Sequence, residues 1–188
     1  MARRRRAYPG YFPATGHGIS GAFKQYWEAN GGLAIFGYPL TEAYLENGQL
    51  VQYFERMRLE QNTSPNGSTK EIRPADLGRE LTSGRTDRAA FAPITPSMSG
   101  VRSYFPATGH TLSPLFSTYW EAYGAQELFG MPISEEMIEV NPSDGRFYTV
   151  QYFEHARLEY HPESNDPAMS ILLGHLGREA LLDRGWQP

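Results

Sequence analysis

The sequence predicts an α+β protein of two tandem repeat units, each an amphipathic helix on a small antiparallel β-meander. The main observation is internal repetition. The heptapeptide Tyr-Phe-Pro-Ala-Thr-Gly-His at 11–17 returns letter for letter at 104–110. Shorter identities follow in the same order, at 26–29 and 119–122, 51–55 and 150–154, and 77–80 and 176–179. A chain with this pattern is a repeat protein first and an enzyme only on further evidence.

The predicted boundaries are 8–82 for the first unit, 83–100 for a linker and 101–188 for the second unit. The linker is rich in Ser, Thr, Pro and Ala and has little periodicity, which is typical of a connecting segment. The second copy is six residues longer, and the insertion falls at the turn 141–145. Insertions are best tolerated at loop tips, so the turn is expected to be exposed.

Composition limits the function classes. The 188 residues suit two small units, and 12 Tyr and 10 Phe supply large buried areas for small cores. A net charge of −4 gives no reason to expect nucleic-acid binding; the run Arg3–Arg6 is interpreted as a solvated terminus or an expression remnant. No apolar run reaches the length of a membrane span, and no signal peptide is recognised in this chain. Absence of Cys excludes disulfides and thiolate metal sites.

Each unit is expected to begin with a turn at Thr-Gly-His and to continue as a helix. Apolar residues at i, i+4, i+7 and i+8 share one helix face: Ile19, Phe23, Tyr26 and Trp27 in the first unit, and Leu112, Phe116, Tyr119 and Trp120 in the second. This face, with both Trp residues, is predicted to be core. Ser20 and Ser113 are expected to cap the helices, and glycines at 31–32 and 124 to end them.

A three-stranded meander is expected after the helix. Residues 43–46 and 50–55 are predicted strands joined by Asn47-Gly48, a strong signal for a two-residue hairpin. A very tight reversal near Arg56 leads to a third strand at 57–61. A polar loop and a short apolar segment precede Leu-Gly-Arg-Glu, which is predicted to form a last helical turn.

Phe36-Gly37-Tyr38-Pro39, followed by Glu42 and by Gln52 and Phe54, resembles the LGFP repeat of bacterial cell-surface proteins. The second copy matches at Phe129-Gly130-Met131-Pro132, Glu135, Gln151 and Phe153. The chain departs from the family pattern where Phe replaces Leu and where Arg56-Met57 or His155-Ala156 replaces the usual Gly. The resemblance implies a secreted module associated with the cell wall, through glycan contact and without a catalytic mechanism of its own.

Several repeated residues are candidates for chemistry. His17 and His110 could be metal ligands or a general base, but no second ligand lies at a suitable spacing, so structural histidines are favoured. Glu55, Arg58 and Glu60 recur as Glu154, Arg157 and Glu159. The carboxylates could in principle perform glycoside hydrolysis, but the intervening Arg favours their ionised forms, and an ion-pair ladder of Glu55 with Arg58 and of Glu154 with Arg157 is predicted instead.

Tyr53 and Tyr152 share a strand face with a Glu and are predicted to be partly exposed, where they could stack on sugar rings. A metal site around His155, His161, Glu163 and Asp166 is conceivable, but a solvated polar loop is favoured. No cofactor, metal or catalytic residue is predicted. The candidate ligand-binding residues are Tyr53, Glu55, Arg58, Tyr152, Glu154, Arg157, His17 and His110.

The predicted function is non-catalytic binding of a cell-wall or extracellular polysaccharide, at the cell surface or outside the cell, with no nucleic-acid partner and no membrane insertion. Binding modules gain avidity from duplication, which favours this interpretation. Two alternatives stay open: a hydrolase with a Glu/His site between the two units, and a structural protein of surface assemblies. The sequence leaves the ligand, the oligomeric state and the packing of the units open.

Overall fold

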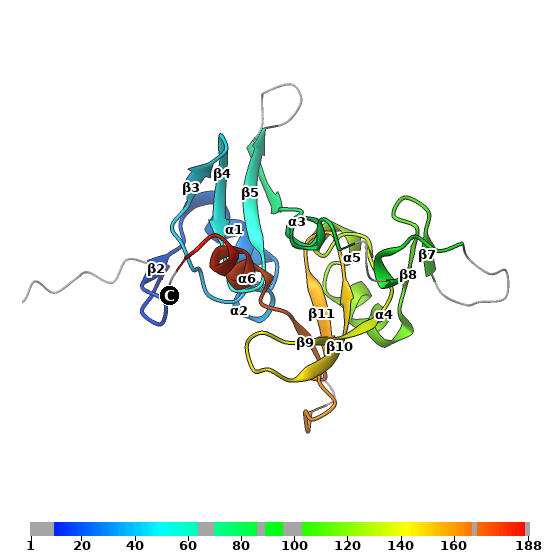
Figure 1. Cartoon of the computed structure of the whole chain (residues 1–188). Helices are drawn as coiled ribbons and strands as arrows, with labels where there is room; N and C mark the ends of the chain where they lie inside the picture. Colours follow the sequence, from blue (N-terminus) through cyan, green and yellow to red (C-terminus); the bar gives the residue numbers. More distant parts are fainter. Residues whose placement is uncertain (1–9, 64–69, 86–88, 96–102, 167–168, 187–188) are drawn as a thin grey trace, which may run out of the picture. The chain divides into compact units, whose positions relative to one another are not determined.

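The computed structural model describes residues 10–63, 70–85, 89–95, 103–166 and 169–186. The Arg3–Arg6 run and parts of the predicted linker and polar loops lie outside the described residues. Helices are combined with small antiparallel sheets, so the predicted α+β class is confirmed (Figure 1). By its internal contacts the chain divides into two compact units, Met1–Ala75 and Asp76–Pro188.

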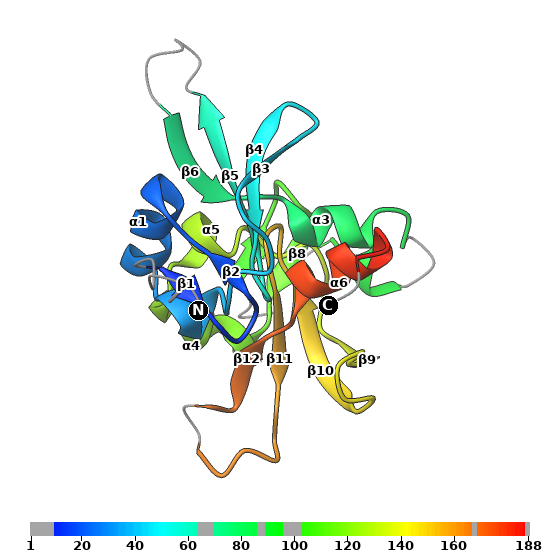
Figure 2. The ribbon, with the colours of Figure 1, turned by 90° about the vertical axis from the view of Figure 1, so that its left-hand side faces the viewer.

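The first unit contains a short hairpin, a helical pair and a four-stranded antiparallel sheet. The sheet order is β3-β4-β5-β6 (Figure 2). The elements are β1 (Tyr11–Phe12), β2 (His17–Gly18), α1 (Gly21–Ala29), α2 (Gly32–Ile35), β3 (Tyr44–Glu46), β4 (Gln49–Tyr53), β5 (Arg58–Thr63) and β6 (Lys70–Pro74).

The second unit contains α3 (Leu77–Thr82) and a 3-10 turn η1 (Ala89–Phe91), and then follows the same order of elements as the first. Its sheet order is β12-β11-β10-β9. The elements are β7 (Ser103–Phe105), β8 (His110–Leu112), α4 (Pro114–Ala122), α5 (Ala125–Leu128), β9 (Met137–Val140), β10 (Phe147–Tyr152), β11 (Arg157–Tyr160), β12 (Ile171–Leu173) and α6 (Leu176–Asp183).

Helix α3 closes the first copy in the sequence, where the boundary was placed at residue 82, but it packs within the second unit. The backbone N–H groups of Gly78 and Arg79 donate to the carbonyl of Glu154 at 2.9 and 3.3 Å. A Cβ atom on Gly78 would lie 1.9 Å from the carbonyl oxygen of Phe153, so only glycine permits this approach. Helix α3 also lies beside α6, as Figure 2 shows.

The predicted hairpin at Asn47-Gly48 is confirmed. Both residues have positive φ, 50° and 82°, and they join Glu46 of β3 to Gln49 of β4. Positive φ at both central positions is what a two-residue turn between twisted strands requires. The tight reversal after β4 is also present, since the N–H of Phe54 donates to the carbonyl of Met57 at 2.9 Å.

Several elements were not predicted, and two kinds of them lengthen the predicted meander and helix of each unit. A fourth strand, β6 or β12, extends each meander, and a short helix, α2 or α5, follows each main helix. Strand β6 reads Lys-Glu-Ile-Arg-Pro, so it has a single Ile and no apolar alternation to reveal it. The glycines that were expected to end the main helices do so and also start the short ones: Gly31 and Gly124 follow the C-cap residues with φ of 95° and 117°, and they are the N-caps of α2 and α5.

Aromatic side chains fill the interior under the main helices. Phe12 packs edge-on against Trp27, and Phe105 packs edge-on against Trp120, both with ring centroids 5.7 Å apart. Each indole N–H also donates to a carbonyl, that of Gly37 at 3.2 Å or that of Gly130 at 3.1 Å. The prediction that this helix face is core is therefore confirmed for Trp120, which is 8% exposed, and Trp27 is partly buried.

The predicted Ser caps differ between the copies. Ser113 accepts a hydrogen bond from the N–H of Leu115 at 3.2 Å, as expected of an N-cap, whereas Ser20 makes no side-chain cap bond. The second copy has Pro114 at the first helical position, where a missing N–H costs nothing.

Trp120→Ala is expected to lower the free energy of unfolding of the full chain by about 3–5 kcal/mol, because it deletes a buried aromatic side chain and its hydrogen bond. Trp27→Ala should cost less, since Trp27 is only partly buried. Urea unfolding measures both, with Leu45→Ala as a control at a side chain that is 70% exposed. An unchanged unfolding curve for Trp120→Ala would contradict the core assignment.

Candidate functional site

The Gln of the repeated Gln-x-Phe pattern is buried and hydrogen-bonds to backbone groups of other segments. Gln151 donates through Nε2 to the carbonyls of Thr111 at 2.7 Å and Ser134 at 2.8 Å, and its Oε1 accepts from the N–H of Ser113 at 3.0 Å. In the first unit, Gln52 donates to the carbonyls of Gly18 and Thr41 in the same way. These bonds satisfy backbone groups that the short strands leave unpaired, and they tie the His-containing hairpin to the sheet.

The acidic residue after the Phe-Gly-x-Pro turn lies beside the repeated histidine. Glu135 accepts from the N–H of Thr111 at 2.9 Å, and its carboxylate is 3.4 Å from Nδ1 of His110, without the geometry of a hydrogen bond. Burial lowers the pKa of His110, and the nearby Glu135 charge opposes this only in part. His110 is therefore neutral near pH 7. The first unit repeats the arrangement with Glu42, 3.7 Å from His17.

Glu154 holds three segments of the second unit together. Its Oε2 accepts from the N–H of Met131 at 2.8 Å, and its Oε1 accepts from Nη2 of Arg79 at 2.6 Å. The side chain lies over Gly130, where a Cβ atom would be 2.5 Å from Cβ of Glu154 and where φ is 79°. The glycine of the Phe-Gly-x-Pro pattern is thus required by both its backbone angle and this close approach.

The electrostatics of Glu154 do not suit a general acid. Burial would raise the pKa of its carboxyl, but the N–H of Met131 and the Arg79 guanidinium outweigh burial and hold the pKa below its ordinary value. A general acid in glycoside hydrolysis needs a raised pKa so that it is protonated at the working pH.

Tyr152 and Arg157 form the centre of a buried polar cluster. The Tyr152 hydroxyl donates to Glu139 at 2.8 Å and accepts from Arg157 and Arg85, each at 3.1 Å. Arg157 also binds Glu159 at 2.6 Å and Glu179 at 2.8 Å through Nη2. Burial opposes the charge on Arg157, but Tyr152, Glu179 and Glu159 outweigh it and raise the pKa of the guanidinium. The cluster is fully paired, as a buried charge requires.

Two sequence predictions about this cluster are wrong. Tyr53 and Tyr152 are not partly exposed: they are 0% and 3% exposed, and their hydroxyl groups donate to the carboxylates of Glu46 and Glu139. Glu154 and Arg157 do not pair with each other. Glu154 binds Arg79, whereas Arg157 binds Glu159 and Glu179. In the first unit, Arg58 lies 3.4 Å from Glu46, and Glu55 accepts from the N–H of Tyr38 at 3.0 Å.

The described part of the predicted linker packs on the second unit. Phe91 lies against the ring of Tyr152 at 5.5 Å, and Arg85 is ion-paired with Glu139. The backbone is also fixed, since the N–H of Ile94 donates to the carbonyl of Gly109 at 2.8 Å. This segment is therefore part of the second unit's structure and not a free spacer.

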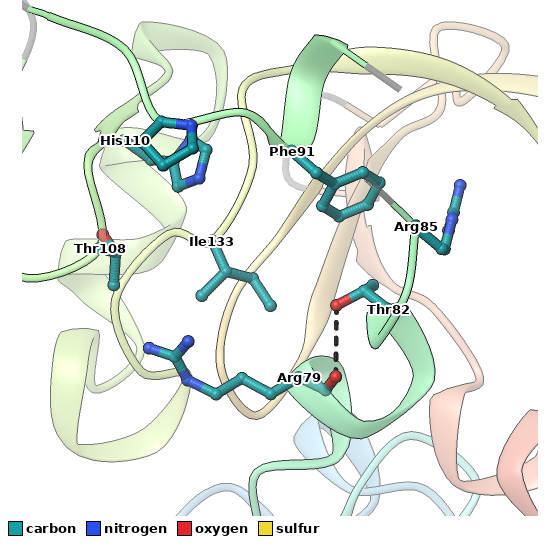
Figure 3. Close-up of a pocket in the computed structure, with 8 residues that line it drawn as sticks. Arg79, Thr82, Arg85, Phe91, Thr108, His110 and Ile133 are labelled. Carbon is teal, nitrogen blue, oxygen red and sulfur yellow. Dashed lines mark hydrogen bonds between the residues drawn. The ribbon is translucent and has the colours of Figure 1, made fainter. Parts of the chain in front are cut away.

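A cleft of about 270 Å³ lies within the second unit beside this segment. In Figure 3 the Arg79 guanidinium, Thr108 and His110 lie on one side of Ile133, and Thr82, Phe91 and Arg85 lie on the other. The lining residues are Arg79, Thr82, Arg85, Phe91, Pro93, Thr108, His110 and Ile133. Of the predicted candidates, only His110 lines the cleft. Arg79 could have been noticed from its repeated Leu-Gly-Arg-Glu, but Arg85 and Phe91 carry no repeat signal.

The loop after β11 is exposed at Pro162, Glu163 and Asp166, as predicted for a solvated polar loop, but His161 makes side-chain contacts. His161 lies between Glu159 at 3.2 Å and Glu163 at 3.1 Å, and its ring stacks on Tyr148 at 3.9 Å. His155 contacts the carbonyl of Leu128 at 3.1 Å. Across the described ranges, no three His, Asp or Glu side chains gather in a way that could hold a metal ion.

No protein-family model and no curated protein matches the chain. Among the helices of the described residues, none has the length and apolar character that a membrane crossing requires.

Glu154→Gln is expected to lower the free energy of unfolding at pH 7 by about 1.5–3 kcal/mol, the usual contribution of hydrogen bonds to a charged group. Because the folded-state pKa of Glu154 lies below the unfolded value, its stabilisation is present above the unfolded pKa and is lost as pH falls through the folded one. The difference between the two proteins should therefore shrink as pH falls below about 4.

Chemical denaturation across pH 3–7, as a rough working range for carboxyl titration, measures this difference. Glu121→Gln, at an exposed position of α4, is the matched control and should be neutral throughout. A constant difference at all pH values would show that the Glu154 charge is not the source of the stabilisation.

Proposed function

We propose that this chain is a non-catalytic module that binds a cell-wall or extracellular polysaccharide. The observation that supports this is the cleft of the second unit. Its lining combines apolar surface from Phe91, Pro93 and Ile133 with the hydroxyl and guanidinium groups around it. Apolar surface with a few converging polar groups is the usual composition of a small-ligand site.

The size of the cleft suits a short stretch of a glycan. Its volume of about 270 Å³ lies just below the roughly 300–1,000 Å³ of sites that enclose a drug-sized molecule. Its position at the surface, with Arg79 and Pro93 exposed, leaves room for a polymer to enter and leave. A polymer that places one residue in the cleft and continues along the surface would fit this geometry.

The resemblance to LGFP repeats supports the cell-surface setting. The motif residues serve structural roles in both units: the glycine admits the overlying Glu, and the Gln connects the hairpin to the sheet. Under this proposal the motif builds the scaffold, and the ligand contacts come from side chains that flank it. The protein would act outside the cell or at its surface, where such a polymer is found.

Assembly into a surface array is a second candidate, favoured by exposed apolar side chains at the edge of the second sheet. Ile138 and Phe147 are 68% and 72% exposed, and Val140 pairs directly with Phe147 across β9 and β10. An exposed apolar edge strand is a site where chains can associate. Static light scattering of the full chain tests this candidate: concentration-dependent growth that Phe147→Lys removes would support assembly.

Phe91→Ala is expected to reduce retention of the full chain on purified bacterial cell walls by about tenfold, equal to ~1.4 kcal/mol of binding free energy. The reason is that Phe91 is the largest apolar side chain among the residues that line the cleft. A co-sedimentation assay measures the bound fraction, with Leu45→Ala as the control. Equal retention of both variants would remove the cleft from the binding site, and release of reducing ends from the polymer would replace binding with hydrolysis.

A further inference from the structure

We infer that the cleft of the second unit takes an uncharged sugar residue and holds it through its hydroxyl groups. This inference rests on the proposed function and names the class of its ligand. It follows from how the charges around the cleft are already paired, from the hydrogen-bonding groups that are left over, and from the apolar surface between them.

The cations of the cleft are matched by carboxylates of the same unit. Arg79 binds Glu154 at 2.6 Å, and Arg85 is paired with Glu139. The third basic group, His110, is uncharged near pH 7 and lies 3.4 Å from Glu135. An acidic ligand would gain little from guanidinium groups that are already neutralised, and it would face the repulsion of these carboxylates.

Hydrogen-bonding groups nevertheless remain. Arg79 uses Nε and Nη2 for Glu154, so its Nη1 makes no bond with the described residues. Arg85 uses Nη1 and Nη2, and its Nε likewise makes none within those ranges. Thr82 donates its hydroxyl hydrogen to the carbonyl of Gly78 at 2.7 Å and keeps its lone pairs as acceptors.

His110 adds an acceptor. His110 lines the cleft and is uncharged near pH 7, so one of its two ring nitrogens accepts a hydrogen bond and the other donates one. Thr108 lies on the same side of the cleft (Figure 3), and its hydroxyl donates to the carbonyl of Phe105 at 3.4 Å and keeps its lone pairs as acceptors. The remaining set therefore contains both donors and acceptors.

A sugar hydroxyl both donates and accepts, so a neutral sugar can satisfy such a mixed set, whereas a carboxylate or phosphate can only accept. Ile133, Pro93 and Phe91 supply the apolar surface on which the C–H face of a sugar ring can pack. The chemistry of the cleft thus matches a neutral pyranose or furanose and does not match an acidic one.

Calorimetric titration of the full chain tests this inference with two sets of soluble probes. The neutral set contains glucan, galactan, arabinan and mannan oligosaccharides; the acidic set contains oligogalacturonate and a glycerol-phosphate oligomer. A neutral oligosaccharide is expected to bind, with a Kd that changes less than about twofold between ~50 and ~500 mM salt, because there is no ionic attraction to screen.

Two variants locate the binding. Thr108→Val removes one hydroxyl and keeps the side-chain shape, and it should weaken binding of the neutral probe about fivefold. Thr15→Val changes the same position of the first heptapeptide, outside this cleft, and should leave the Kd unchanged. Circular dichroism of both variants checks that the fold is intact.

The outcomes separate the inference from the function on which it rests. Binding of the acidic probes alone, weakened more than about tenfold by salt, would overturn the inference and keep the proposed function. Neutral binding that Thr108→Val does not change would also overturn it, since the sugar would then lie elsewhere. If no probe of either set binds and the full chain is not retained on cell walls, both the inference and the proposed function are overturned.

Discussion

The carboxylate of Glu154 is the contact on which the second unit depends most. It joins the N–H of Met131, in the Phe-Gly-x-Pro turn, to the guanidinium of Arg79 on α3, and the backbone carbonyl of the same residue accepts from α3. Three segments far apart in the sequence therefore meet at one side chain. The short strands and helices around it could not hold this arrangement by their own hydrogen bonds, since small elements leave many backbone groups unpaired.

Polar groups organise the interior of the unit as much as apolar ones do. The buried Gln151 connects the hairpin to the sheet by hydrogen bonds. The Tyr152 hydroxyl bonds to Glu139 and to the guanidinium groups of Arg157 and Arg85. Every such group has its partners, so the network tolerates few alternative arrangements. Glu154, Arg157 and Glu159, which the sequence offered as candidates for a charged reaction centre, are engaged in hydrogen bonds and ion pairs within the second unit.

Local signals in the sequence predicted local structure well. Asn47-Gly48 determined its hairpin because only residues that adopt positive φ fit there, and the i, i+4 spacing located the helix faces. Strand β6 was not predictable because its sequence has one apolar residue, and the burial of Tyr152 was not, because its partners come from distant segments. The cleft itself was missed, since Phe91 and Arg85 belong to a stretch without periodicity whose role appears only when it folds onto β10.

The packing of residues 83–85 and 89–95 on the second unit determines where the chain can be divided. A fragment that starts at residue 101, the predicted start of the second repeat unit, would lose five cleft residues: Arg79, Thr82, Arg85, Phe91 and Pro93. It would also lose the contact of Phe91 with the ring of Tyr152. A fragment that starts at Asp76 retains all of them. A fragment that keeps the whole second unit is therefore longer than the sequence repeat. Fragment boundaries chosen from the sequence identity between the copies would remove part of this unit.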